Sequence, residues 1–102
     1  GLFELLKEGF VPDDQTLYAI GATPNKPVAF VWSMNTGSFL VNGTRCSGIM
    51  LGLNAPVSIA SIVSANYNGT ATLNIPQGMA PVGVYLQSVD VKTCTTSNII
   101  EL

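Results

Sequence analysis

The sequence predicts an all-β protein built as a single antiparallel β-sandwich, and three observations support this prediction. Short β-branched and aromatic segments recur at intervals of roughly 8–12 residues, as they do in sandwiches. Turn residues, above all Asn-Gly, Pro-Asn and single glycines, separate these segments. No interior segment of the 102 residues keeps a helical period. We therefore expect about seven to eight strands.

The first half of the body contains four of these segments. Residues 15–22 alternate in polarity and end at a glycine, and Pro24-Asn25 follows as a turn. Residues 27–34 (PVAFVWSM) have the strongest strand composition in the chain. Residues 38–41 lead into an Asn-Gly pair, which favours a hairpin turn. Residues 49–53 are apolar but contain a glycine, so we expect a tight or bulged strand.

The second half of the body contains the other four. Residues 56–65 alternate, which places Val57, Ile59, Ser61 and Val63 on one predicted face. A second Asn-Gly pair at 68–69 leads into a strand over 70–75. Two further strands are predicted over 83–91 and 95–102.

Residues 1–14 form an apolar N-terminal arm ahead of the predicted sandwich domain, residues 15–102. The sequence of the arm is compatible with two structures: a short helix, which Gly9 and Pro12 would end, or an extended strand. Its apolar side chains must pack somewhere, either on their own domain or on a neighbouring copy. These side chains are Leu2, Phe3, Leu5, Leu6, Phe10 and Val11.

The charges are few and unevenly placed. Charged residues make up 10% of the chain, against roughly 25% in ordinary soluble domains, and half of them lie in residues 1–14. The net charge of −2 predicts no nucleic-acid partner. The chain has no histidine, and the adjacent carboxylates of Asp13 and Asp14 have no further ligands beside them in the sequence, so we expect no catalytic residue, no metal site and no cofactor. No run of 18 apolar residues occurs, so we expect no membrane span.

Cys46 and Cys94 are the only cysteines. Two thiols without histidine make a zinc site improbable, and their spacing is not that of a CxxC redox motif. A disulfide is the favoured interpretation, because an all-β chain rich in Asn and Thr is typical of an oxidising, extracellular setting. The alternative is a pair of buried free thiols in a cytosolic domain.

Two sequons and two aromatic residues complete the candidate sites. Asn42 and Asn68 each begin an Asn-Gly-Thr sequence, which is an N-glycosylation sequon but also a common turn. Trp32 and Tyr67 have the chemistry to stack on a sugar, although a single tryptophan within a strand is more often part of the core.

Four segments resemble secreted β-sandwich modules of large extracellular proteins in planctomycetes, myxobacteria and related environmental bacteria. They cover nearly all of residues 15–102, with one cysteine before a glycine- and leucine-rich stretch and the other within VDVKTCTTSN. The resemblance implies an immunoglobulin-like sandwich and a Cys46–Cys94 bridge. It carries over no catalytic or ligand residue, because the modules are mostly of unassigned function. The segments are GATPNKPVAFVWS (21–33), CSGIMLGLNAP (46–56), NGTATLNIP (68–76) and VYLQSVDVKTCTTSNII (84–100).

These observations predict a non-enzymatic protein located outside the cell or on its surface. Because the body carries so little charge, repulsion does little to prevent self-association. We expect a structural subunit of an extracellular homopolymer, a filament or pilus-like assembly, in which the arm of one copy docks head-to-tail on the sandwich of the next. The alternative is a carbohydrate- or surface-binding adhesive module with glycans as partners.

Overall fold

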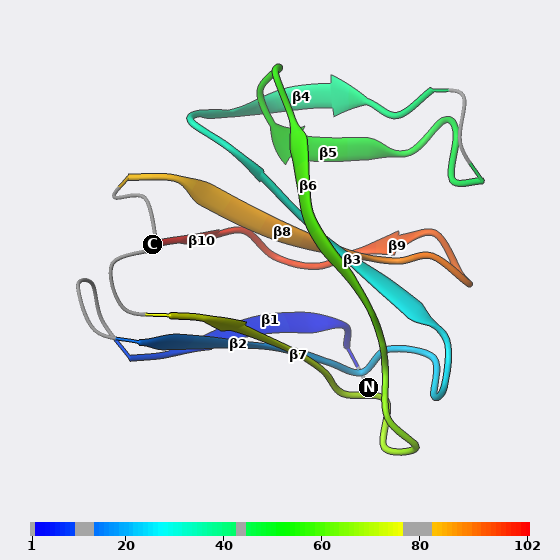
Figure 1. Cartoon of the computed structure of the whole chain (residues 1–102). Coiled ribbons are helices and arrows are strands. Elements are labelled where there is room, and N and C mark those ends of the chain that lie inside the picture. The colour runs from blue at the N-terminus through cyan, green and yellow to red at the C-terminus, as the bar shows by residue number, and fades with distance from the viewer. Residues whose placement is uncertain (1, 10–13, 43–44, 77–82) are drawn as a thin grey trace.

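The structure is a computed structural model, and it describes residues 2–9, 14–42, 45–76 and 83–102. The described residues form ten strands and no helix, and every strand pairing is antiparallel (Figure 1). The predicted all-β class is therefore confirmed. The strands are β1 (Glu4–Glu8), β2 (Gln15–Ile20), β3 (Pro27–Ser33), β4 (Thr36–Leu40), β5 (Met50–Leu53), β6 (Ser58–Ser64), β7 (Ala71–Ile75), β8 (Tyr85–Asp90), β9 (Thr95–Thr96) and β10 (Ile100–Glu101).

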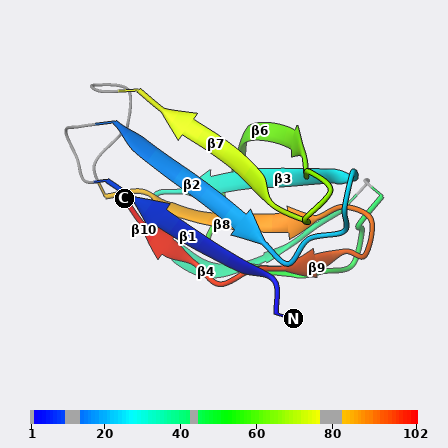
Figure 2. The same ribbon diagram turned by 90° about the horizontal axis from the view of Figure 1, so that it is seen from below.

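Two sheets and a hairpin lie in three tiers. The first sheet has the order β1-β2-β7, and the second has the order β10-β8-β3-β6 with β9 also paired to β8. These two sheets face each other as an antiparallel β-sandwich, which confirms the predicted architecture. The β4–β5 hairpin forms a third tier on the far side of the second sheet (Figure 1). Figure 2, which is seen from below, shows the β1-β2-β7 sheet in front of the second sheet.

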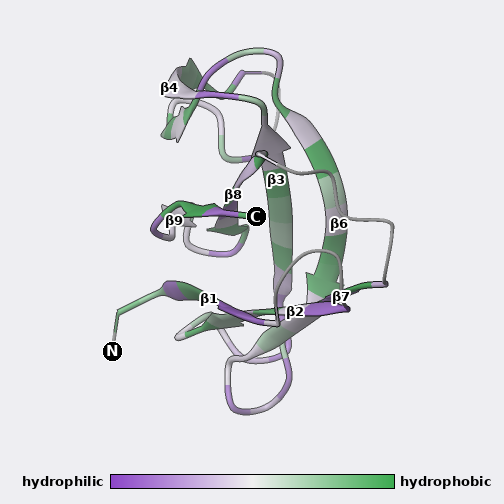
Figure 3. Ribbon diagram, turned by 90° about the vertical axis from the view of Figure 1, so that its left-hand side faces the viewer, coloured by the Kyte–Doolittle hydropathy of each residue, from purple (hydrophilic) through white to green (hydrophobic). Residues whose placement is uncertain are grey.

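The second sheet is apolar on both faces, and each face builds a separate core. Along β3, Val28 and Phe30 point into the sandwich, whereas Ala29 and Val31 point toward the hairpin. Alternate side chains of β3 therefore pack in two different cores. In keeping with burial on both faces, β3 contains no charged residue (Figure 3). The inner core includes Leu5, Leu17, Ala19, Ala71, Val84 and Leu86. The outer core includes Cys46, Leu51, Leu53 and Val89.

The arm contributes a strand to its own sandwich. β1 pairs with β2 over five residue pairs, from Glu4 with Ile20 to Glu8 with Thr16. Leu5 is 1% exposed and packs in the inner core, and Phe3 packs partly against that core. Leu2 and Leu6 are exposed. Residues 4–8 of the arm thus pack on their own domain, one of the two alternatives that the sequence left open. These residues adopt the strand alternative in their own chain.

The outer edge of β1 is covered at Leu5 by one side chain. The Leu5 backbone N–H donates to Asn98 Oδ1 at 2.8 Å, and Asn98 Nδ2 donates to the Leu5 carbonyl at 3.1 Å. A side-chain amide thus replaces a neighbouring strand at this position. Phe10 and Val11, which were also predicted to pack as part of the arm, lie outside the described residues.

Candidate functional site

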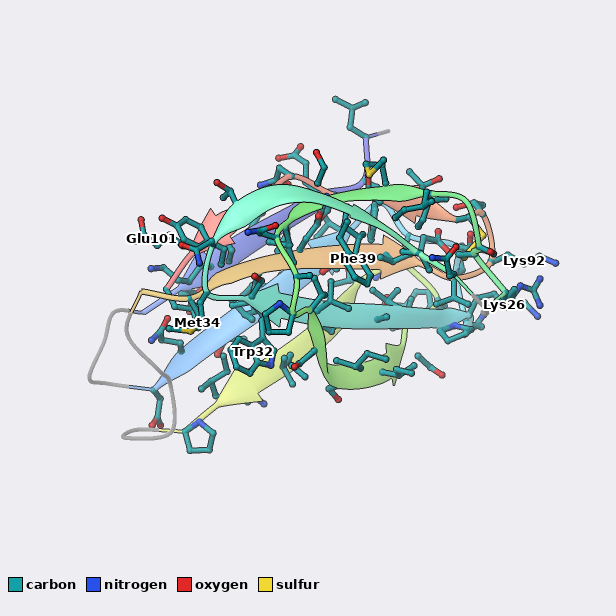
Figure 4. The ribbon with its side chains drawn as sticks, turned by 90° about the horizontal axis from the view of Figure 1, so that it is seen from above. Lys26, Trp32, Met34, Phe39, Lys92 and Glu101 are labelled. Carbon is teal, nitrogen blue, oxygen red and sulfur yellow. A yellow bond between two sulfur atoms is a disulfide. The ribbon has the colours of Figure 1, made fainter. Side chains whose placement is uncertain are left out.

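The candidate site is an apolar groove between the hairpin and the outer face of the second sheet. Its volume is about 490 Å³, which lies in the range of small-molecule sites. Figure 4, seen from the hairpin side, shows Phe39 over the middle of the sheet. Apart from Asn42 and Arg45, every lining residue in the described ranges is apolar. The apolar lining residues are Ala29, Val31, Phe39, Leu40, Val41, Cys46, Ile49, Leu51, Val57, Ile59, Ile62, Val89 and Val91.

A β-bulge determines which side chains of β6 face this groove. Ser61 pairs with Phe30, but the next pair along the ladder joins Ile59 to Val31. Ala60 is therefore an extra residue, and it reverses the alternation on one side of the bulge. As a result Ile59 and Ile62 both line the groove, and they are 63% and 59% exposed. The prediction that Ile59 shares a face with Ser61 was wrong, because simple alternation does not anticipate a bulge.

The hairpin wall is held to the sheet by a disulfide. Cys46, in the connection between β4 and β5, is bonded to Cys94, in the turn between β8 and β9, with a Cα–Cα distance of 5.3 Å. The predicted Cys46–Cys94 bridge is confirmed, and the alternative of two free thiols is wrong.

Two polar side chains of the second sheet hold the rest of the hairpin. The buried amide of Gln87 accepts from the Gly52 N–H at 3.0 Å and donates to the Ser97 carbonyl at 2.8 Å. The hydroxyl of Ser33 lies against the carbonyls of Asn35 and Asn54 on either side of the hairpin. Together with the disulfide, these contacts fix the groove wall at both ends of the hairpin.

A basic corner adjoins one end of the groove. Lys26, Arg45 and Lys92 line a small cavity of about 200 Å³ together with Pro27 and Val91. Arg45 and Val91 line both this cavity and the groove, so the two are adjacent. Figure 4 shows Lys26 and Lys92 at the same end of the molecule. Three of the four basic residues of the chain thus gather at one corner of an acidic protein.

Asp90 is buried beside this corner and has a structural role. Its carboxylate accepts from the N–H and hydroxyl of Thr23 at 2.8 and 2.9 Å and from the Lys92 N–H at 3.0 Å. Burial alone would raise the pKa of Asp90. The hydrogen bonds from Thr23, Lys92 and the backbone of Thr93 outweigh burial, and the net pKa is lowered. A carboxylate so fully engaged is poorly placed for proton transfer.

The remaining sequence candidates lie apart from the groove or at its rim. Asn68 is exposed in the turn between β6 and β7, and Asn42 is exposed at the groove, although the rest of its sequon (43–44) lies outside the described residues. Trp32 packs partly against the inner core, which agrees with the core interpretation. Tyr67 is 79% exposed in the β6–β7 turn. Trp32 and Tyr67 therefore do not form a shared stacking surface.

Within the described ranges, no group of three or more Asp, Glu or Cys residues is placed to hold a metal ion. Those ranges also contain no helix that is long and apolar enough to cross a membrane.

Comparison with known proteins found no match: no family model matches the sequence, and no curated protein matches it. The resemblance to secreted modules of planctomycetes and myxobacteria therefore stays a prediction.

Proposed function

We propose that this chain is a non-enzymatic structural module of an extracellular assembly, and that copies associate through the open edge of β6. The observation that carries this proposal is the character of β6 itself. It is the last strand of the second sheet, β3 is its only partner strand among the described residues, and most of its residues are exposed. Edge strands of monomeric proteins are normally protected by charges, prolines or covering segments, because their free backbone groups recruit other strands.

β6 lacks charged protection along its whole length. No charged residue occurs between Cys46 and Val89, a stretch that includes β5, β6 and β7. The strand presents Ser, Ala and Ile to solvent, and within the described part of the chain the bulge is the one feature that protects this edge. Strand addition at such an edge supplies backbone hydrogen bonds, and the adjoining apolar side chains supply burial.

The extracellular location rests on the disulfide, because such bonds persist in oxidising compartments. The absence of enzymatic activity is supported by the state of the reactive groups. The chain has no histidine, both cysteines are paired, and Asp90 is engaged by hydrogen bonds. None of these groups is available as an activated nucleophile or general base.

Docking of the arm on a neighbouring copy would require β1 to leave its own sheet. That movement would expose Leu5 and break five residue pairs with β2, unless an identical β1 replaced it. Association through β6 requires no such exchange, and it is therefore the mode that we propose.

Sedimentation analysis of charged variants tests the proposal. The double variant Ser58→Lys/Ala60→Lys places two cations on exposed β6 positions that do not line the groove. Its self-association should weaken by about tenfold or more, because charge on an edge strand opposes pairing. The matched control Met34→Lys/Met50→Lys adds the same charge at exposed apolar residues outside β6. Equal loss in both variants, or a wild-type chain that stays monomeric at millimolar concentration, would refute association through β6.

A further inference from the structure

The groove and the basic corner together have the form of a site for an amphiphile. The groove contributes an apolar channel that is walled by Phe39 and Leu51 of the hairpin and floored by Val31 and Val89 of the sheet. It is open on the β6 side, where Ile59 and Ile62 remain more than half exposed. Apolar side chains in this position gain free energy when a hydrocarbon covers them.

The chemistry of the lining favours a hydrocarbon chain over a peptide. A peptide brings one N–H and one C=O per residue, and each requires a partner when it is buried. Among the described lining residues, polar side chains occur only at Asn42 and Arg45, both on the connection between the two hairpin strands. An alkyl chain requires no hydrogen-bonding partner, so it fills such a channel without an unpaired polar group.

The charge at the groove end selects the head group. Lys26, Arg45 and Lys92 line one small cavity, and their side chains form no ion pair within the described part of the chain. Three unpaired cations in proximity repel one another, and an anion placed among them relieves this repulsion. Arginine is well suited to a carboxylate, because its guanidinium donates two parallel hydrogen bonds.

We propose that this groove binds a long-chain carboxylate, with the alkyl chain along the hairpin and the carboxylate at Lys26, Arg45 and Lys92. The groove includes the side chains of Ile59 and Ile62 but not the free backbone groups of β6, so the inference does not depend on self-association. Arg45 and Val91 line both cavities, so a carboxylate at the basic corner lies next to the end of the groove that holds the alkyl chain.

Calorimetric titration with palmitate below its micelle concentration tests this site. The triple variant Lys26→Gln/Arg45→Gln/Lys92→Gln should weaken binding by about tenfold, as expected for the loss of several exposed charge contacts. The control Lys7→Gln removes the fourth basic residue, which lies on β1 away from the groove, and should leave the affinity within about twofold. Ile62→Glu places a carboxylate at the open side of the groove and should also weaken binding.

Two further measurements separate this inference from its competitors. Methyl palmitate, which lacks the negative charge, should bind more weakly than palmitate, and added salt should reduce the difference. No palmitate binding, equal binding of the ester, or equal loss in Lys7→Gln would overturn the proposal. Ser58→Lys/Ala60→Lys should bind palmitate like the wild type, so failure of the assembly proposal and failure of this one give different results.

Discussion

Thr23 donates two hydrogen bonds, from its backbone N–H and its hydroxyl, to the same oxygen of Asp90, at 2.8 and 2.9 Å. Thr23 lies between β2 and β3, whereas Asp90 ends β8, so the pair joins a connection between the sheets to the second sheet. The other carboxylate oxygen accepts from the N–H of Lys92 at the start of the turn that carries Cys94. One buried carboxylate thus organises the corner where the disulfide and the basic side chains meet.

We expect this carboxylate to make stability depend on acidic pH. The folded-state pKa of Asp90 is lowered, so its contribution is complete above the unfolded-state pKa, near 3.9, and is lost as the pH falls through the folded value. Asp90→Asn should lower the free energy of unfolding by about 1–3 kcal/mol at neutral pH. Urea denaturation at pH 7 and pH 3 measures both effects.

A surface carboxylate provides the control for this experiment. Glu8→Gln removes an exposed carboxylate at the end of β1 and should change stability by less than about 0.5 kcal/mol. If Asp90→Asn retains the wild-type loss of stability between pH 7 and pH 3, then Asp90 is not the source of that loss.

The disulfide should account for a large part of the stability of the hairpin. The bridge closes a loop with a sequence separation of 48 residues, which is worth about 4 kcal/mol in the chain-entropy account. The free energy of unfolding of Cys46→Ala/Cys94→Ala, measured by chemical denaturation, should be lower than that of the wild type by up to this amount. Cys94 has φ +56°, so Cys46→Ala/Cys94→Gly should be the more stable of the two variants, by about 0.5–1 kcal/mol. Equal stability of the two variants would show that this backbone conformation relaxes when the bridge is lost.

The strands of this fold were predictable because their signals are local. The eight predicted segments of the body correspond to β2 through β8 and to the β9–β10 region, with boundaries differing by one or two residues in most cases. β-branched composition and turn dipeptides act over a few residues, and each is visible in a single sequence. The division of residues 95–102 into β9 and β10 was missed because both parts pair with β8 at separate positions.

The groove was not predictable for a different reason. It depends on the hairpin folding back over the outer face of the second sheet, and hydrophobic alternation does not say which segment covers a face. The side of the groove formed by β6 also depends on the bulge at Ala60. No glycine marks this bulge in the sequence of the strand. The basic corner likewise brings together three residues from separate connections, which no spacing rule relates. The absence of charge between Cys46 and Val89 was the one visible sign that this surface is unusual.

A buried hydroxyl in the second sheet offers a stabilising substitution. Ser88 is fully buried opposite Phe30, and its Oγ has no hydrogen-bond partner in the described part of the chain. An unpaired buried polar group costs about 1–3 kcal/mol, so Ser88→Ala should raise the free energy of unfolding by about 1 kcal/mol. The comparison is Ser97→Ala, which removes a hydroxyl that accepts from the Ser88 N–H at 2.8 Å and should be destabilising. Thermal denaturation checks the prediction: the melting temperature should rise in Ser88→Ala and fall in Ser97→Ala.

The last prediction concerns Asn98, whose side-chain amide holds both backbone groups of Leu5 and so keeps β1 in its own sandwich. Deleting the whole arm cannot isolate this role, because it also removes Leu5 from the core. Asn98→Ala should instead lower stability by about 1–2 kcal/mol and leave the edge of β1 free. Asn98→Asp still accepts from the Leu5 N–H but cannot donate to its carbonyl, so its stability should lie between those of the wild type and Asn98→Ala.

If β1 exchanges between copies, oligomers should increase from wild type through Asn98→Asp to Asn98→Ala in sedimentation analysis. If association runs through β6, both variants should lose stability while their oligomeric state follows that of the wild type, because Asn98 lies at the opposite end of the second sheet from β6.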